Sequence, residues 1–229
     1  AGKQAEVIAA MLAQARTPAM GLGELMQAAG QLQARGLNEA AASLYREWLA
    51  HHTSPLASVA CYNLGTILGQ LNKHGEAEQA YRQALVHKPD FVQAQLNLGH
   101  QLEHQGRQED ALLQWAEIGD ASRPMDAVGV DPLELRLHAL NNMARLLETM
   151  RRYAESEQRM RQSLQLKPDQ ADVLQHYVHI RQKQCEWPVY QPVGEVTENQ
   201  LLMSTSLLAM LSATDDPALQ LMSSQRFVR

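Results

Sequence analysis

The strongest constraint on this chain is a pattern of residue types that repeats after 34 residues. The matched pairs are Leu64 and Leu98, Gly65 and Gly99, Ala77 and Ala111, and Tyr81 and Trp115. An interval of this length is typical of arrays in which each repeat is a pair of helices. One helix pair cannot bury its apolar face alone, so neighbouring pairs must stack. The stack leaves an extended surface suited to binding.

The amino-acid composition agrees with a helical array. Of the 229 residues, 45% are hydrophobic and only 5% are aromatic, while Ala, Leu and Gln dominate. These residue types favour helix over strand. We therefore expect an all-α fold, a right-handed α-solenoid of helix pairs with an irregular helical extension at its C-terminal end.

Charge, hydropathy and cysteine content exclude several classes of protein. The net charge is −5 and no basic stripe is present, so we expect no nucleic-acid binding. The longest apolar-leaning stretch, Leu201–Ala213, is too short to cross a bilayer, so we expect no membrane insertion. No secretory signal is recognisable, and two cysteines, Cys61 and Cys185, form no disulfide framework. A reducing, cytoplasmic setting is therefore expected.

Apolar periodicity divides the chain into three parts. Residues 1–18 are predicted to be a helix that covers one end of the stack, since their apolar residues recur at spacings of three and four. Residues 19–184 are predicted to be the stack itself. Its repeats are expected at 22–55, 58–91, 92–125 and 137–170, with one further helix at 171–184. Residues 185–229 are predicted to be a linker with two short helices, near 198–211 and 217–227.

Turn and capping residues mark the expected helix ends. Gly36 suits the positive φ that follows a helix, and Asn38 could cap the next helix. Pro89 and Pro168 should each end the second helix of a repeat, because proline cannot continue a helix.

An insertion at 126–136 delays the fourth repeat. Asp131 followed by Pro132 reads as a helix cap and a first-turn proline. The first helix of the fourth repeat is therefore expected to begin early and to run to about Met150. In the same way, Asp215 or Asp216 is expected to cap the last helix.

The repeated residues resemble the tetratricopeptide repeat family. That family places a large residue, Leu, Gly, Ala, an aromatic residue, Ala and Pro in this order over 34 residues. The matching positions are Leu64, Gly65, Ala77, Tyr81, Pro89, Leu98, Gly99, Ala111, Trp115 and Pro168. The resemblance implies that the small residues let paired helices approach closely and that the large ones fill the space between pairs. Trp48 and Trp115 are accordingly expected in the core.

The segment after the repeats resembles the junction in bacterial O-linked N-acetylglucosamine transferases of the SPINDLY-like group. In that family tetratricopeptide repeats lead through such a junction into a glycosyltransferase domain. The resemblance rests on Cys185-Glu186-Trp187-Pro188, on Leu207 to Leu211 and on Asp215 to Leu221. It implies a chain that stops before its catalytic domain, for which the donor would be a UDP-sugar.

We expect no catalytic residue and no cofactor within the 229 residues themselves. Sugar transfer from a nucleotide needs a diphosphate site, usually in an α/β domain, and nothing here alternates strand and helix. Gly21-Leu22-Gly23 is too short to be a phosphate loop. Whether the parent protein is a glycosyltransferase stays open at this point.

Asparagine recurs one position before the repeated Leu or Met, as Asn63, Asn97 and Asn142. In tetratricopeptide geometry this position faces the concave groove. A carboxamide offers two donors and an acceptor, so it can hold both the N–H and the C=O of an extended peptide. The resemblance to the sugar transferases implies an asparagine ladder of this kind. The alternative is that asparagine is simply common at this repeat position.

Further residues are predicted to line the same groove. They are Tyr62, Leu96, His100, Asn141 and Arg145, together with Glu103 and Glu148. These side chains would give the groove a mixed polar character. The alternative is an ordinary solvated helix face.

Two other features favour structural roles. His100 and His104 have the i, i+4 spacing of metal ligands, but no third ligand converges on them, so no metal site is expected. Cys185 lacks the His–Asp pattern that would support a nucleophile. It is expected to be buried against Trp187.

The favoured function is protein or peptide binding in the concave groove. In a longer protein, the repeats would recruit substrates for an enzyme similar to bacterial O-linked N-acetylglucosamine transferase. The alternative is a free-standing scaffold or adaptor with no enzymatic domain. Self-association is also possible, since truncated arrays expose apolar end faces.

Overall fold

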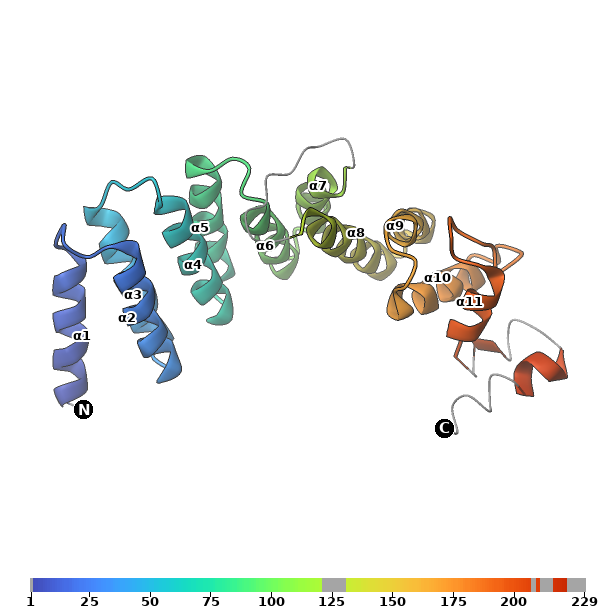
Figure 1. The fold of residues 1–229 in the computed structure, drawn as a ribbon, viewed down its shortest axis with the longest axis horizontal. Helices are drawn as coiled ribbons and strands as arrows, with labels where there is room; N and C mark the ends of the chain where they lie inside the picture. Colours follow the sequence, from blue (N-terminus) through green and yellow to red (C-terminus); the bar gives the residue numbers. More distant parts are fainter. Residues whose placement is uncertain (1, 121–130, 207–208, 211–215, 222–229) are drawn as a thin grey trace. The chain divides into compact units, whose positions relative to one another are not determined.

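A computed structural model describes residues 2–120, 131–206, 209–210 and 216–221 of the chain, and these residues are mainly helical (Figure 1). The described residues form two compact units, one ending at Gln114 and the other beginning at Trp115. No strand occurs among them, only a single bridge between Val193 and Val196. The prediction of an all-α fold is confirmed.

Most helices have 12 to 14 residues, as expected for helix pairs. The first unit contains α1 (Gly2–Ala15), α2 (Leu22–Ala34), α3 (Asn38–His51), α4 (Ala57–Gln70), α5 (His74–His87) and α6 (Val92–His104). Helix α7 (Gln108–Gly119) begins in the first unit and ends in the second. The second unit continues with α8 (Pro132–Thr149), α9 (Tyr153–Leu166), α10 (Ala171–Lys183) and α11 (Glu198–Ser204).

Consecutive helices pack on one another within each unit. In the first unit α2 packs on α3, α3 on α4, α4 on α5 and α5 on α6, while α1 packs on α3. In the second unit α8 packs on α9, α9 on α10 and α10 on α11. Trp48 and Trp115 are both buried, as predicted, and the Trp48 indole donates a hydrogen bond of 2.8 Å to the carbonyl of Met20.

The pairing of α4 with α5 depends on the small residue that the repeat pattern conserves in both copies. A Cβ atom at Gly65 would lie 2.8 Å from Cε1 of Tyr81, closer than van der Waals contact allows. Tyr81 is itself buried and its ring lies over the Gly65 backbone. The structure therefore bears out the expected close approach at this pair.

One turn recurs at the end of the first helix of each repeat. Gly36, Asn72, Gly106 and Arg151 all have a φ between 58° and 76°. The next residue donates its N–H to a carbonyl five positions earlier, as Lys73 does to the Leu68 carbonyl at 2.9 Å and Arg152 to that of Leu147 at 2.9 Å. This is the Schellman pattern, which satisfies carbonyls at a helix end. The prediction for Gly36 is confirmed, and Asn72 and Arg151 adopt the same conformation without being glycine.

The capping prediction for Asn38 is wrong. Asn38 is the first helical residue of α3, the N-cap is Leu37, and no side chain caps this helix. The Schellman turn places Leu37 at the boundary, because its N–H already bonds to the Leu32 carbonyl at 2.9 Å.

The caps predicted by aspartate and proline are confirmed where the structure describes them. The Asp131 carboxylate accepts a hydrogen bond of 2.9 Å from the N–H of Leu133, and α8 then runs for 18 residues to Thr149. Asp216 accepts one of 2.8 Å from the N–H of Ala218. Asp215 and the residues after Leu221 lie outside the described ranges.

A buried carboxylate joins the start of α5 to the turn after α6. Glu78 accepts hydrogen bonds from Gln105, at 2.9 Å, from Arg107, at 2.9 and 3.0 Å, and from Arg82, at 3.0 Å. Burial alone raises the pKa of Glu78, but these donors outweigh it and hold the pKa below its ordinary value.

The segment after α10 folds back onto the last repeat helix. Val189, Tyr190, Val193 and Val196 are buried in one cluster with α10 residues such as Tyr177. Instead of the extended stretch expected over 189–196, the chain makes a turn closed by two hydrogen bonds between Val193 and Val196. Helix α11 follows, capped by Thr197, and ends at Ser204, seven residues short of the predicted limit.

The prediction that Cys185 is buried against Trp187 is wrong. Cys185 is exposed, and 64% of the Trp187 surface is exposed. Cys185 has a φ of 56° and forms the same turn that ends the first helices, with the N–H of Glu186 donating to the Arg181 carbonyl at 2.9 Å. The turn keeps residues 185–187 at the surface, and Val189 is the first residue to pack inward.

Candidate functional site

The first helices of the repeats carry the predicted groove residues, and in the first unit these lie on α4 and α6. We call this surface the first-helix face and define it by Tyr62, Asn63, Leu96, Asn97 and His100. All five side chains are half-buried. Such positions are partly fixed by packing yet still accessible to a ligand.

Asn97 is held in place by two tyrosines. Its Nδ2 donates hydrogen bonds to the hydroxyls of Tyr62, at 3.3 Å, and Tyr81, at 3.4 Å. Burial raises the pKa of Tyr81, so the phenol stays neutral and can accept this bond. No described residue donates a hydrogen bond to Oδ1 of Asn97, which leaves an acceptor oriented by the rest of the side chain.

Asn63 has the equivalent contact one repeat earlier. Its side chain hydrogen-bonds with Tyr45 on α3, a phenol whose pKa is raised by burial and lowered in part by this bond. In both repeats the asparagine of a first helix therefore contacts a tyrosine on the second helix of the preceding repeat. This contact gives the asparagines a structural role that the spacing alone did not reveal.

Aromatic side chains lie beside Asn97. The rings of Tyr62 and Phe91 are 5.0 Å apart and tilted by 36°, and the Lys88 ammonium lies 5.8 Å from the Phe91 ring centre. His104, by contrast, stacks on His74 with ring centres 4.7 Å apart. Its ring is thus engaged with α5 rather than paired with His100 as a metal ligand.

In the second unit, first helices α8 and α10 border a pocket of about 260 Å³. Ala144, Val173 and Met160 give it apolar walls. Its polar lining residues are Asn141, Arg145, Glu148, Asp172 and His176. Two predicted groove residues, Asn141 and Arg145, are thus brought together with Glu148. Asn142 lies on the same helix and is half-buried, but it does not line this pocket.

Asn141 is oriented by groups on neighbouring elements. Its Nδ2 donates to Oε1 of Gln170 at 3.0 Å, and its Oδ1 accepts from the Ser163 hydroxyl at 2.6 Å. With both ends of its amide occupied, Asn141 is a wall of the pocket rather than an open peptide ligand.

Charges alternate along the border between α8 and α10. Glu148 pairs with His176 at 3.2 Å and with Lys183 at 3.6 Å. Burial lowers the pKa of His179, and the positive charges of Lys183 and His176 lower it further against the opposing effect of Glu148. Asp172, His176 and Lys183 were not among the committed groove residues, because their approach to Glu148 depends on how α10 packs, which repeat spacing does not determine.

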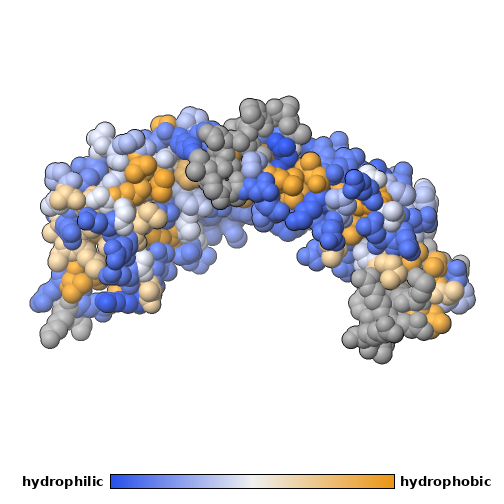
Figure 2. All heavy atoms as spheres, in the orientation of Figure 1, coloured by the Kyte–Doolittle hydropathy of each residue, from blue (hydrophilic) through white to orange (hydrophobic). Residues whose placement is uncertain are grey.

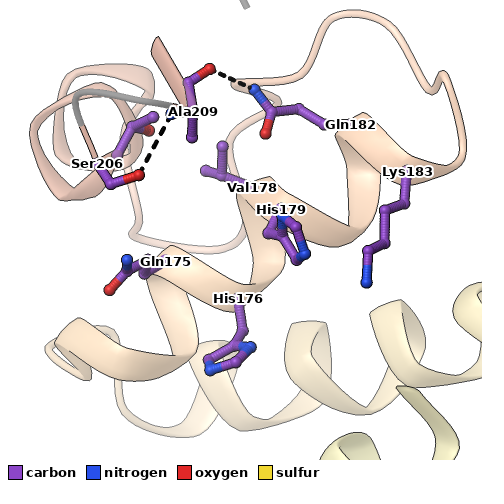
Figure 3. Close-up of a pocket in the computed structure, with 9 residues that line it drawn as sticks. Gln175, His176, Val178, His179, Gln182, Lys183, Ser206 and Ala209 are labelled. Atoms are coloured by element: carbon purple, nitrogen blue, oxygen red, sulfur yellow. Dashed lines mark hydrogen bonds between the residues drawn. The ribbon is translucent and has the colours of Figure 1, made fainter. Parts of the chain in front are cut away.

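A larger hollow of about 600 Å³ lies between α10 and residues 205–209 (Figure 3). Figure 3 shows Gln182 reaching to the Ala209 carbonyl, a hydrogen bond of 2.8 Å, while His176 and Lys183 point away from Ser206. This hollow exists because the chain after α11 returns to the surface of α10. Nothing in the sequence pattern predicted it.

The described surface offers no broad apolar face. Figure 2 shows small orange patches over α1, over α4 and α5, and over α8, separated by hydrophilic residues. The exposed large apolar side chains, such as Val86 at 72% and Leu113 at 63%, lie on different helices. Among the described helices, none combines the length and the apolar character needed to cross a membrane. No group of three or more potential metal ligands occurs in the same residues.

Two stretches match models of the tetratricopeptide repeat, residues 62–126 and residues 139–174. These stretches include most of the predicted second, third and fourth repeats, and the chain thus contains tetratricopeptide repeats. The predicted first repeat, 22–55, lies outside both matches. No curated protein matches the sequence.

Solved structures of helical-repeat proteins resemble the chain. A double mutant of MamA from strain RS-1 superposes with a TM-score of 0.62 at 16% identity, covering 86% of this chain and 100% of MamA. Pseudomonas aeruginosa PilF gives 0.57 at 20% identity, covering 94% and 83%. YrrB gives 0.55 at 16%, covering 88% and 91%. At these identities the likeness establishes the solenoid fold alone.

Proposed function

We propose that the chain is a protein-binding module whose first-helix face holds an extended segment of a partner protein. Tetratricopeptide repeats are of the kind used for protein and peptide binding, and YrrB is described as having a peptide-binding site. The observation that carries the proposal is the oriented acceptor of Asn97. A carboxamide fixed at one end and open at the other can accept the N–H of a peptide backbone.

The surroundings of Asn97 support backbone recognition. Tyr62 and Phe91 offer a half-buried aromatic surface for apolar side chains of the partner. The asparagines recur at one repeat interval, as would be required to follow an extended peptide. Asn142 supplies the third position of this ladder in the second unit.

A binding measurement tests the proposal. A random peptide library is selected against the chain, and the best peptide is titrated by calorimetry into variants at the ladder. Asn63→Ala, Asn97→Ala and Asn142→Ala should each weaken binding by about 1 kcal/mol, the worth of one hydrogen bond. Asn38→Ala is the matched control, because Asn38 is a half-buried helical asparagine on α3, away from this face.

Unchanged affinity in all three ladder variants would overturn the role of the asparagines. Tyr81→Phe provides a further distinction. It removes one hydroxyl that holds Asn97 but leaves the amide in place, so its effect on binding should be smaller than that of Asn97→Ala.

A finer proposal is that the repeats recruit substrates for a sugar transferase. Its support is the resemblance of residues 185–221 to the transferase junction, and the comparisons add none. The free-standing adaptor is the competing role. Sequencing the reading frame beyond Arg229 decides between them, because only the transferase requires an α/β domain there. Light scattering tests the third role, self-association.

A further inference from the structure

A second groove lies on the side of α10 that faces the returning chain, apart from the first-helix face. Two hollows form it, one of about 430 Å³ and one of about 600 Å³, and both include Gln175. One side consists of residues 169–183, and the other consists of α11 and the residues after it, 200–209. We call this the α10–α11 groove.

The charges of this groove are segregated along its length. Asp169 and Asp172 line the hollow at the start of α10. Neither carboxylate forms an ion pair or a side-chain hydrogen bond with a described residue. His176, His179 and Lys183 line the hollow beside the later part of α10. One end is therefore acidic and the other is basic.

The neighbouring elements neutralise the basic end only in part. From α8, Glu148 contacts both His176 and Lys183, and Arg145 adds a positive charge near His176. From α9, the Tyr153 ring lies 5.3 Å from the Lys183 ammonium. Residues 205, 206 and 209 carry no charge. One carboxylate thus faces one lysine, one arginine and two histidines.

The middle of the groove is apolar with amide and hydroxyl groups at its edges. Val178, Ala209 and Met203 provide the apolar surface. Gln175 and Ser206 provide polar groups that can pair with a peptide backbone. This mixture suits a main chain with one or two small aliphatic side chains.

The length of the groove sets the length of its ligand. From Asp169 to Lys183 the helical rise spans about 21 Å, at 1.5 Å per residue. An extended chain covers that distance in about six residues, at 3.3 Å each.

We propose that the α10–α11 groove binds an extended peptide of about six residues that carries basic residues at one end and acidic residues at the other. The basic end lies at Asp169 and Asp172, and the acidic end lies at His179 and Lys183. This site is independent of the asparagine ladder, since it uses neither the same residues nor the same side of the array's helices.

Three labelled peptides test the proposal by fluorescence anisotropy with the full chain. The first is acetyl-Lys-Lys-Ala-Val-Ala-Glu-Glu-amide, the second has the reverse order, and the third has the same composition with alternating charges. One of the two segregated peptides should bind most tightly, and its affinity should fall as salt rises. Equal affinity for all three would overturn the proposal.

Single variants then locate the site. Asp172→Asn and Lys183→Ala should each raise the Kd of the preferred peptide by up to about fivefold, as expected for exposed ion pairs. Lys167→Ala is the matched control, because Lys167 is an exposed lysine with one ion pair, to Glu134 at 3.0 Å, and lines neither hollow. A Kd unmoved by both groove variants would place the binding elsewhere and refute the assignment.

A charge exchange gives the sharpest result. In the double variant D172K/K183E the preference should pass to the peptide of opposite order, which a structural role for either residue would not produce. Asn97→Ala should leave all these affinities unchanged. Failure of the asparagine ladder and failure of this groove are therefore distinguishable.

Discussion

Replacing Gly65 with alanine tests the packing on which the repeat pattern depends. The added Cβ would lie 2.8, 2.9 and 3.0 Å from three ring carbons of Tyr81. Ordinary contact begins at 3.4 Å, so the ring must move by about 0.6 Å. The Tyr81 ring is buried, and its hydroxyl lies 3.2 Å from Thr66 Oγ1 and 3.4 Å from Asn97 Nδ2, so it cannot swing aside freely.

Two opposing effects set the size of the change. Overpacking a buried site costs about 1–3 kcal/mol, whereas alanine is about 1 kcal/mol more favourable than glycine inside a helix. The overpacking should win because the ring is held at both its face and its hydroxyl. We expect Gly65→Ala to lower the free energy of unfolding by about 1–2 kcal/mol.

Thermal melting followed by circular dichroism measures the change. Gly30→Ala is the matched control, because Gly30 lies within α2 and nothing lies within 4 Å of its ideal Cβ position. The control should melt slightly above the unmodified chain and Gly65→Ala several degrees below it, at about 2–4 °C per kcal/mol. A double-mutant cycle with Tyr81→Leu should show coupling, because the smaller side chain relieves the clash. Additive effects, or a gain in stability equal to that of the control, would refute the packing argument.

Three further predictions concern the core, a buried carboxylate and the thiols. Trp115→Ala should cost about 3–5 kcal/mol in chemical denaturation, because Trp115 is fully buried, and an unmoved transition would contradict the repeat register. Glu78→Gln should flatten the acid limb of the stability profile. The lowered pKa of Glu78 stabilises the fold above its unfolded value near 4.5, and this stability is lost as pH falls through the folded value. Identical acid limbs would exclude this effect. A thiol reagent should modify Cys185 quickly and Cys61 only on unfolding, since Cys61 is buried and burial raises its pKa. Cys185→Ser should remove the fast phase, and a remaining fast phase would show that Cys61 is accessible.

The helices were predictable because their signals are local. Apolar spacing identified the N-terminal helix, and the Asp131-Pro132 pair identified the early start of α8. Gly36 marked a positive φ because glycine adopts it without strain. Asn72 and Arg151 were not recognised, because nothing in their residue types requires the same conformation, and the helix pair around each residue imposes it.

The candidate sites were predictable only in part. Repeat spacing placed Asn63 and Asn97 at one position, but it could not show that each side chain contacts a tyrosine of the preceding repeat. Cys185 was misplaced for a similar reason. A cysteine beside a tryptophan favours burial by composition, yet the turn that ends α10 keeps both at the surface.

By itself, the sequence determined that the chain is a helical array, because a 34-residue period and the alternation of small and large residues are properties of residue order. Only the tertiary structure decided which atoms of Asn97 remain open and where the chain folds back after α11. It also decided how the charges of α10 are distributed between two hollows. These features depend on contacts between residues distant in sequence, and periodicity carries no information about such contacts where the repeats end.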